Sequence, residues 1–395
     1  MTLQSPPLQG LRVLDLSRVL AGPTCTMTLA DLGAEVIKVE RPGQGDDTRQ
    51  WGPPFDDAGL SAYFCSCNRN KRSLTLDLKS ADGRRLLLAL ARISDVVVEN
   101  FLPGTLDRLG LGYDVLRQQR ADIVLCSITG FGQSGPRHQE PGYDLLIQGM
   151  SGLMSITGQA ADAPLKVGVA ITDVNAGLYA STTILAALWR RASTGVGEHL
   201  DVALLDTAIA SLANVATAYL MTGQTPIRHG NAHPSIVPYQ VFACADGPLI
   251  IAVGNDRQWQ ALCGVLERRS WQEREDWQTN PGRVAQREHL CAELSDLLAT
   301  LPRQETMQAL QDAGVPCGPV NELPEVFGEA QIEHRHLCRP MPSTDLVGFP
   351  VQLKRTDPLP WRSPPTLGEH SQEILTNLLG LSLDQVDELR RHNVV

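Results

Sequence analysis

Residues 11–40 read LRVLDLSRVLAGPTCTMTLADLGAEVIKVE. The apolar run at 11–16 predicts a short strand. Residues 25–32 follow helical spacing up to a stop at Gly33, and the stretch at 35–40 predicts a second strand. A strand, a helix and a strand in this order form one βαβ unit, in which the two strands run parallel. This stretch sets the expected class as α/β.

The same alternation continues downstream. It predicts a Rossmann-like large domain, in which helices cover a mostly parallel sheet. The further strands are predicted at 74–78, 96–99, 123–129 and 199–203, and the helices at 81–93, 174–191 and 205–221.

Changes in composition indicate where the domains end. Residues 1–205 form the N-terminal part of the large domain, 206–238 a linker helix and loop, and 239–322 a small α+β domain. The small domain contains a hairpin at 239–253 and helices near 257–266, 286–300 and 303–313. Residues 323–395 are rich in Pro up to 365, close with a charged helix at 383–392, and are expected to wrap another surface.

Charge and composition exclude several classes of protein. The 395 residues carry 34 Lys+Arg against 44 Asp+Glu, so nucleic-acid binding is not expected, because phosphate contact needs a basic face. The N-terminus lacks the features of a secretory signal, and the nine scattered cysteines suit reduced thiols, so we interpret the chain as cytoplasmic. Polar residues interrupt the apolar stretches at 174–189 and 204–221, which we interpret as buried core helices and not as membrane spans.

Several segments that follow strands offer polar or charged groups. The βαβ unit at 11–40 lacks the G-x-G-x-x-G fingerprint, which argues against a nicotinamide dehydrogenase. Arg41, at the end of a strand, is either a solvated charge or a group for adenine or phosphate. The basic run at 68–72 is likewise either a solvated face or a polyphosphate site. The Gly-rich loop at 129–136 either connects two elements or binds an anion through its N–H groups.

Asp173 is the most informative position. It lies between an apolar segment and a long apolar helix, so its carboxylate is either a helix N-cap or a functional group. Tyr143 and Asp144 offer a second carboxylate about thirty residues earlier. No G-x-S-x-G nucleophile elbow occurs, and Cys65 and Cys67 lack the partners of a zinc site, so no metal is expected.

Ordered motifs run along almost the whole chain: GLRVLDLSRVLAGP, LGAEVIKVERPGQGDDTR, NRNKRSLTLDLK, VVVENFLPGTLDRLGLGY, SITGFGQSGP, GYDLLIQGMSGL, ITDVNAGLYA and PPTLGEHSQEIL. Together they resemble the class III CoA-transferases, the group of formyl-CoA transferase and the α-methylacyl-CoA racemases. The chain is most similar to the succinyl-CoA:glutarate and itaconate CoA-transferases, with which it shares GDDTRQWGPPF, HPSIVPYQVF and the stretch around GVPCGPVN.

The resemblance implies that Asp173 is a catalytic nucleophile, which forms an acyl anhydride and then an aspartyl-CoA thioester. It implies an interlocked homodimer, a C-terminal segment that returns to the large domain, and coenzyme A as part of an acyl-CoA substrate with no permanently bound cofactor. A carboxylic acid is the second substrate. The positions that match CoA contacts of the family are Leu20, Ala21, Arg41, Leu76, Leu78, Lys79, Asn100, Phe101, Arg108, Tyr143 and Asp144.

Departures from the family pattern bear on the substrate. Leu20 stands where formyl-CoA transferase has Gln, Pro141 replaces a lysine, and residues 228–234 replace a tetraglycine lid, all of which argue against formate or oxalate. Two alternative functions remain, an α-methylacyl-CoA racemase or epimerase and a formyl-CoA-type transferase that uses another carboxylic acid. The racemases carry His-Asp where this chain has Tyr143 and Asp144. A dicarboxylate substrate needs a cation for its free carboxylate, and the candidates are Arg18, Arg49 and His233, each of which is equally suited to a structural ion pair.

Overall fold

The computed structural model describes residues 4–357 and 360–395. The chain forms two compact units. The first unit contains the residues up to Leu153, Lys166–Gln224, and the residues from Glu333 onward. The second unit contains Met154–Leu165 and Thr225–Ile332.

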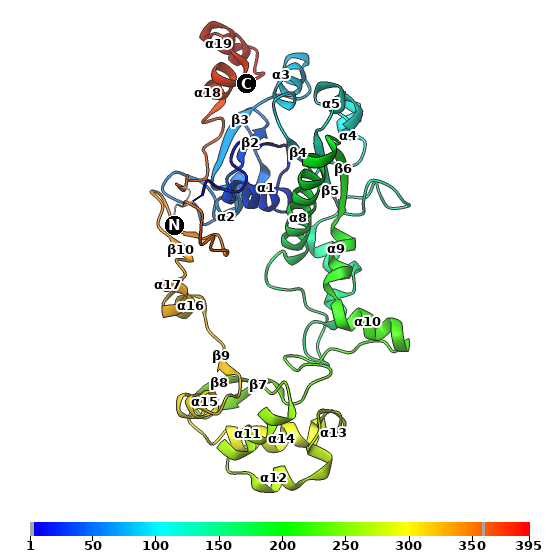
Figure 1. The fold of residues 1–395 in the computed structure, drawn as a ribbon, viewed down its shortest axis with the longest axis vertical. Coiled ribbons are helices and arrows are strands. Elements are labelled where there is room, and N and C mark those ends of the chain that lie inside the picture. Colours follow the sequence, from blue (N-terminus) through cyan, green and yellow to red (C-terminus); the bar gives the residue numbers. More distant parts are fainter. Residues whose placement is uncertain (1–3, 358–359) are drawn as a thin grey trace. The chain divides into compact units, whose positions relative to one another are not determined.

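The first unit is built on a six-stranded sheet in the order β3-β2-β1-β4-β5-β6, and every neighbouring pair is parallel (Figure 1). This confirms the predicted α/β class and the mostly parallel sheet. The strands are β1 (Arg12–Asp15), β2 (Glu35–Glu40), β3 (Lys71–Thr75), β4 (Val96–Glu99), β5 (Val124–Thr129) and β6 (Glu198–Ala203).

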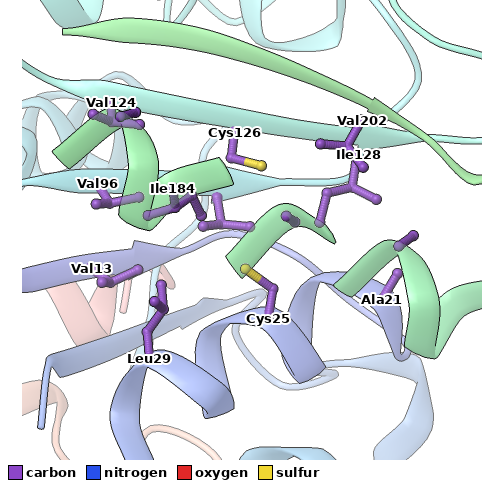
Figure 2. Close-up of a cluster of buried hydrophobic side chains, with 14 of the residues drawn as sticks. Val13, Ala21, Cys25, Leu29, Val96, Val124, Cys126, Ile128, Ile184 and Val202 are labelled. Atoms are coloured by element: carbon purple, nitrogen blue, oxygen red, sulfur yellow. The ribbon is translucent and has the colours of Figure 1, made fainter. Parts of the chain in front are cut away.

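Successive side chains of the four central strands β1, β2, β4 and β5 enter two different cores, because they point to opposite faces of the sheet. Val13 of β1 belongs to one core, which α1 and α8 cover, and Leu14 belongs to the other, which α3, α18 and α19 help to cover. Figure 2 shows the first core, where Cys25 and Leu29 of α1 meet Ile184 of α8 and the strands. A sheet buried on both faces explains why its strands read as near-continuous apolar runs.

The helices of the first unit confirm most of the predicted ones. They are α1 (Ala21–Asp31), α2 (Ala62–Asn68), α3 (Ala81–Ala91), α4 (Thr105–Arg108), α5 (Tyr113–Gln119), α6 (Asp144–Met150), α8 (Ile171–Thr194), α9 (Leu204–Ser211), α10 (Ala213–Thr222), α18 (Ser371–Leu379) and α19 (Leu383–Arg391), with a 3-10 turn η1 (Asp47–Gln50). Short strands β10 (Cys338–Arg339) and β11 (Leu346–Val347) also belong to the first unit. The short helix α16 (Leu323–Phe327) belongs to the second unit, and α7 (Leu153–Ile156) and α17 (Ala330–His334) each contain residues of both units.

The basic run at 68–72 is part of the protein core, so both readings of it from the sequence were wrong. Lys71 Nζ lies 3.0 Å from Asp15 Oδ2, and both side chains are fully buried. Arg69 Nη2 lies 2.5 Å from Asp31 Oδ2, also in the interior. The acids that pair with these cations precede them by 56 and 38 residues, so the local sequence did not reveal them. The run also begins β3, which starts at Lys71 and not at residue 74.

The helix predicted at 205–221 is broken. It bends by 79° between α9 and α10, next to Ala213 with a φ of 45°. The interpretation of both apolar stretches as buried core helices was wrong for α10, which has no buried residue because the bend directs it away from the core. Within residues 4–357 and 360–395, no single helix has the length and apolarity to cross a membrane; α9 and α10 meet that criterion only as a bent pair.

The second unit has a three-stranded antiparallel sheet in the order β7-β8-β9. Its hairpin lies where the sequence predicts it, and its core includes three buried Trp side chains at 259, 271 and 277. The elements are β7 (Tyr239–Cys244), β8 (Gly247–Ala252), β9 (Cys317–Pro319), α11 (Asp256–Val265), α12 (Arg269–Glu273), η2 (Glu275–Trp277), α13 (Asn280–Ala285), α14 (Arg287–Leu298) and α15 (Arg303–Asp312).

Candidate active site

A cavity of about 560 Å³ opens in the first unit where the parallel strands end. Segments that follow each of the six strands contribute to its walls, which is the position where open parallel sheets bind ligands. The residues that the sequence proposed for the site and that line this cavity are Arg18, Leu20, Ala21, Arg41, Leu76, Leu78, Lys79, Asn100, Phe101, Tyr143 and Asp173.

Four proposed residues are not among the lining residues. Arg108 is exposed and donates to Thr105 Oγ1, 2.8 Å away. Arg49 is held by Glu40, whose carboxylate accepts from Nε at 2.8 Å and from Nη2 at 2.7 Å. His233 belongs to the second unit. The fourth residue, Asp144, is half-buried and accepts hydrogen bonds from Thr172 and Gln148.

Asp173 is a buried carboxylate at the edge of the cavity. It lies in the first turn of α8, whose N-cap is Ala170, so Asp173 is not the N-cap. Asp173 is only 8% exposed. Within the described part of the chain, no residue forms a hydrogen bond or an ion pair with its carboxylate. Burial first, and then the charge of Asp144, raise the pKa of Asp173 to about 7.

Asp144 supports the start of the helix that carries Asp173. Its Oδ1 accepts from the backbone N–H of Thr172 at 2.9 Å and from the Thr172 hydroxyl at 2.8 Å. Its Oδ2 accepts from Gln148 at 2.7 Å. Asp144 is therefore fixed beside Asp173 as a fully hydrogen-bonded carboxylate, while Tyr143, which precedes it, is 64% exposed and lines the cavity.

Arg18 is the candidate cation that reaches the cavity. Its Nη1 lies 3.1 Å from Asp47 Oδ2, and both side chains are about half exposed, at 43% and 54%. Its guanidinium carbon lies 5.9 Å from the centre of the Phe101 ring. Because the ion pair is solvated, Arg18 can exchange Asp47 for another carboxylate at little cost.

Sequence reasoning did not assign a role to several residues near Asp173. Burial, and next the charge of Asp173, raise the pKa of Tyr63 to about 12. Asp46 and Asp47 line the cavity in the segment 41–47, which follows β2. In the sequence both residues belong to the motif GDDTR, which contributes to the family resemblance. The signal that could have located them is the position of this motif after a parallel strand.

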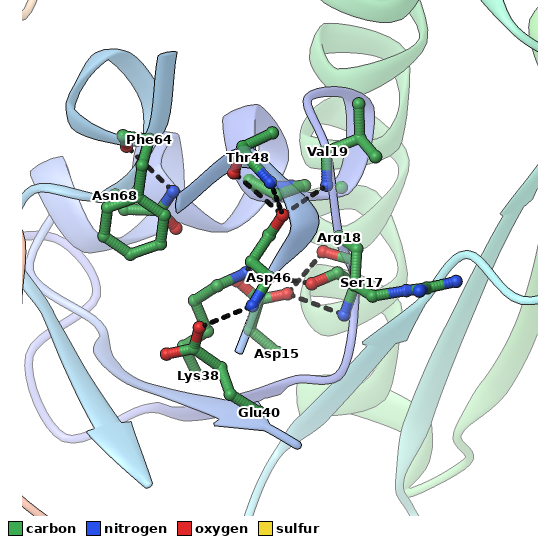
Figure 3. Close-up of polar contacts among 12 residues, drawn as sticks. Asp15, Ser17, Arg18, Val19, Lys38, Glu40, Asp46, Thr48, Phe64 and Asn68 are labelled. Carbon is green, nitrogen blue, oxygen red and sulfur yellow. Dashed lines mark hydrogen bonds and ion pairs between the residues drawn. The ribbon is translucent and has the colours of Figure 1, made fainter. Parts of the chain in front are cut away.

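Buried charges brace the strands next to the cavity. Lys38 Nζ lies 2.9 Å from Asp46 Oδ2, and both side chains are fully buried. Burial alone would lower the pKa of Lys38, but the nearby carboxylates, with Asp46 foremost, raise it above its usual value. Figure 3 shows this lysine together with Asp46 and Glu40 under the segment that follows β1.

Comparison with known proteins decides the family. The profile of CoA-transferase family III matches residues 8–371. The chain belongs to this enzyme family. Members of CoA-transferase family III act on CoA thioesters, so coenzyme A enters as part of a substrate.

Relatives match the family III chain over nearly its whole length. It is 44% identical over 386 residues to a succinate–glutarate CoA-transferase of Agrobacterium fabrum, covering 95% of this chain and 96% of the relative. It is 41% identical over 394 residues to the human succinyl-CoA:glutarate CoA-transferase, covering 98% and 90%. A solved CAIB/BAIF family protein of Brucella suis matches with a TM-score of 0.85 and 43% identity, covering 95% of this chain and 100% of that one.

Proposed function

We propose that this enzyme moves CoA from succinyl-CoA to a second dicarboxylic acid, such as glutarate or itaconate, through covalent intermediates on Asp173. The observation that carries the proposal is a buried carboxylate without a cationic partner, on the wall of a cavity at the ends of parallel strands. Burial and the Asp144 charge leave this carboxylate poorly stabilised, which favours it as a nucleophile.

The proposed reaction balances without water. The Asp173 carboxylate attacks the thioester carbonyl of succinyl-CoA, and CoA leaves as a thiolate, so that a mixed anhydride remains. The thiolate attacks the Asp173 carbonyl of this anhydride, which expels succinate and leaves an aspartyl-CoA thioester. The acceptor carboxylate then attacks the aspartyl thioester and expels the thiolate, which leaves a second mixed anhydride between Asp173 and the acceptor. In the last step the thiolate attacks the acceptor's carbonyl and releases Asp173 as a carboxylate.

Each tetrahedral intermediate carries an oxyanion, and α1 offers donors for it. Leu20 is the N-cap of α1 and Ala21 its first residue, and both line the cavity together with Asp173. The first N–H groups of a helix have no partner within the helix. Preorganised N–H donors of this kind stabilise developing negative charge.

The other lining residues suit the remainder of CoA. Leu76, Leu78 and Phe101 offer apolar surface. The exposed cations Arg41 and Lys79 suit phosphate groups. Arg108 of α4 donates to the hydroxyl of Thr105, a residue that lines the cavity. We assign the free carboxylate of the dicarboxylate to Arg18, because Arg49 is already bound by Glu40. His233 stays a prediction.

An acceptor panel tests the function. With succinyl-CoA as donor, glutarate, itaconate, mesaconate and malate are offered, with formate and oxalate as controls, and the new CoA esters are measured. We expect transfer to several dicarboxylates, because one methylene changes binding by only about 1–3 kcal/mol. Transfer to formate or oxalate alone would contradict the proposal, as would α-proton exchange in an acyl-CoA without any CoA transfer.

We also propose that the enzyme is a homodimer, as the family resemblance implies. Apolar side chains left exposed on the first unit support it, including Trp189 at 83%, Leu220 at 81% and Met221 at 80%. A second copy of the chain would cover such side chains.

A further inference from the structure

Val19 holds an unfavourable backbone conformation beside the cavity. Its φ is 69°, in the left-handed region, and among the six non-glycine residues with positive φ in the described chain it is the only β-branched one. Branching at Cβ makes this region especially costly, and such strain persists only where the surroundings over-determine it. Val19 lies in the connection from β1 to α1, directly before Leu20 and Ala21.

Asn100, which directly follows β4, forms two hydrogen bonds with the backbone of Arg18, the residue before Val19. Its Oδ1 accepts from the backbone N–H of Arg18 at 2.9 Å, and its Nδ2 donates to the backbone carbonyl of Arg18 at 2.7 Å. This pair of bonds imitates the two bonds by which neighbouring strands exchange backbone groups. The Asn100 carboxamide is therefore engaged with the chain itself, although Asn100 also lines the cavity.

Asp46 is hydrogen-bonded to the backbone of Val19 itself. Its Oδ1 accepts from the Val19 N–H at 3.2 Å and from the Thr48 N–H at 3.0 Å, as Figure 3 shows. Lys38 fixes the carboxylate through its other oxygen and donates to the carbonyl of Ser17 at 2.9 Å. The backbone from Ser17 to Val19 is thus clamped at consecutive peptide groups by buried or half-buried side chains.

We infer that Asn100 is a positioning residue, which together with Asp46 keeps the Arg18–Val19 turn left-handed and so directs the first N–H groups of α1 into the cavity. The inference rests on the proposed function for the use of those N–H groups. It differs from the role that the family resemblance gives Asn100, which is contact with CoA. A CoA contact supports substrate binding, whereas a positioning residue supports the chemical step.

A double-mutant cycle separates the two roles. Asn100→Ala is made in the parental chain and in a Val19→Gly chain, because Gly adopts positive φ without a Cβ penalty and needs less bracing. In the parental chain we expect kcat to fall about 10- to 100-fold, with less than about threefold change in KM for succinyl-CoA. In the Val19→Gly chain the same substitution is expected to change kcat less than about threefold.

Asn70→Ala is the matched control. Asn70 is also half-buried and also braces the backbone, with Oδ1 accepting from the Arg362 N–H at 2.8 Å, but it does not contact the turn at 17–19. Its effect is expected to be equal in both backgrounds. Asn100→Asp, which keeps the acceptor and loses the donor to Arg18, is a second variant and is expected to be relieved by Val19→Gly in the same way.

Crystal structures of the variants test the inference without reference to activity. We expect Val19 to move to negative φ in Asn100→Ala. A left-handed Val19 in that variant would overturn the inference, whatever the transfer assay shows. So would an equal loss of kcat in both backgrounds, a rise in KM with kcat intact, or a Val19→Gly chain that is itself more than about tenfold slower than the parent.

Discussion

Asp173 lies where a carboxylate is costly to ionise, because it is buried and Asp144 stands beside it with its own charge. An ordinary surface aspartate would be ionised at all physiological pH values but would also be a weak nucleophile in water. In this site the raised pKa lowers the ionised fraction of Asp173 near neutral pH, whereas the poor solvation of its carboxylate increases its reactivity.

The pH dependence of transfer follows from the raised pKa. The carboxylate is the attacking form and the protonated acid is inactive, so kcat/KM should rise with pH through about 7 and level off above it. Asp144→Asn removes the neighbouring charge, so it should move the rise to lower pH. The measurement is the pH profile of kcat/KM from 5 to 9.

Glu99 supplies the control for this profile. Burial raises its pKa to about 7 as well, so it would titrate in the same range. Glu99→Gln should leave the rise in place. A profile that is flat from pH 5 to 8, or a rise that disappears in Glu99→Gln, would contradict the assignment to Asp173.

Substitutions of Arg18 and of its partner Asp47 are expected to change the KM for succinyl-CoA in opposite directions. Arg18→Ala should raise KM for succinyl-CoA about tenfold or more and leave KM for butyryl-CoA nearly unchanged, since only succinyl-CoA has a free carboxylate to bind. Asp47→Asn frees Arg18 from its ion pair and should lower KM for succinyl-CoA. Arg85→Ala, in an exposed Arg85–Asp82 pair away from the cavity, is the matched control. Equal effects of Arg18→Ala on both acyl-CoA substrates would refute this role.

At the scale of elements, the site depends on how closely α1 and α8 approach. A Cβ built on Gly177 of α8 would lie 2.6 Å from the carbonyl oxygen of Ala21 in α1. A side chain larger than that of glycine would not fit this approach of α1 and α8, which lie side by side in Figure 1. Asp173 of α8 and Ala21 of α1 line the same cavity. The close approach of the two helices therefore depends on the missing side chain at Gly177.

Gly177→Ala tests this arrangement. The added methyl group must push α1 away from α8, so we expect a loss of about 1–3 kcal/mol in the free energy of unfolding. We also expect about a tenfold or larger fall in kcat, because the reacting groups are displaced. Gly264→Ala in α11 is the control, since its Cβ would meet nothing within 4 Å, and it should be neutral or slightly stabilising. Unchanged stability and kcat in Gly177→Ala would show that the close approach is dispensable.

The elements were predictable where the pattern is local, and unpredictable where distant residues decide it. Period and length alone located β1, β2 and the long helix that carries Asp173. The interpretation of the basic run at 68–72 was wrong because the acids that pair with it in the interior, Asp15 and Asp31, are far away in the sequence. In the site, Asp173 stood out by its setting, but the contribution of Asp46 depends on the three-dimensional approach of Val19 and Lys38.

At the scale of the whole molecule, the proposed homodimer explains an apolar helix without a core. α10 has no buried residue, and its Leu220 and Met221 are about four-fifths exposed, at 81% and 80%. Such neighbouring side chains are favourable in a protein only where something covers them. A single chain of 42.9 kDa leaves them in water.

Light scattering tests the assembly. The parental protein should have twice the chain mass of 42.9 kDa. Leu220→Asp combined with Met221→Asp should shift the equilibrium toward the single chain, because both charges would be buried in the dimer. Leu383→Asp, at a residue 58% exposed on α19, is the matched control and should leave the mass unchanged. A parental mass of one chain would remove the homodimer from the account.

The covalent state of Asp173 is the most direct test of the whole account. The protein is incubated with succinyl-CoA in the absence of any acceptor, quenched in acid, and analysed by intact mass and by peptide mapping, beside Asp173→Asn verified free of deamidation. The account predicts a CoA adduct on the peptide that contains Asp173, its loss when glutarate or another accepted acid is added before quenching, and no adduct or transfer in Asp173→Asn. Transfer at the parental rate by Asp173→Asn, or a CoA adduct on any other residue, would contradict it.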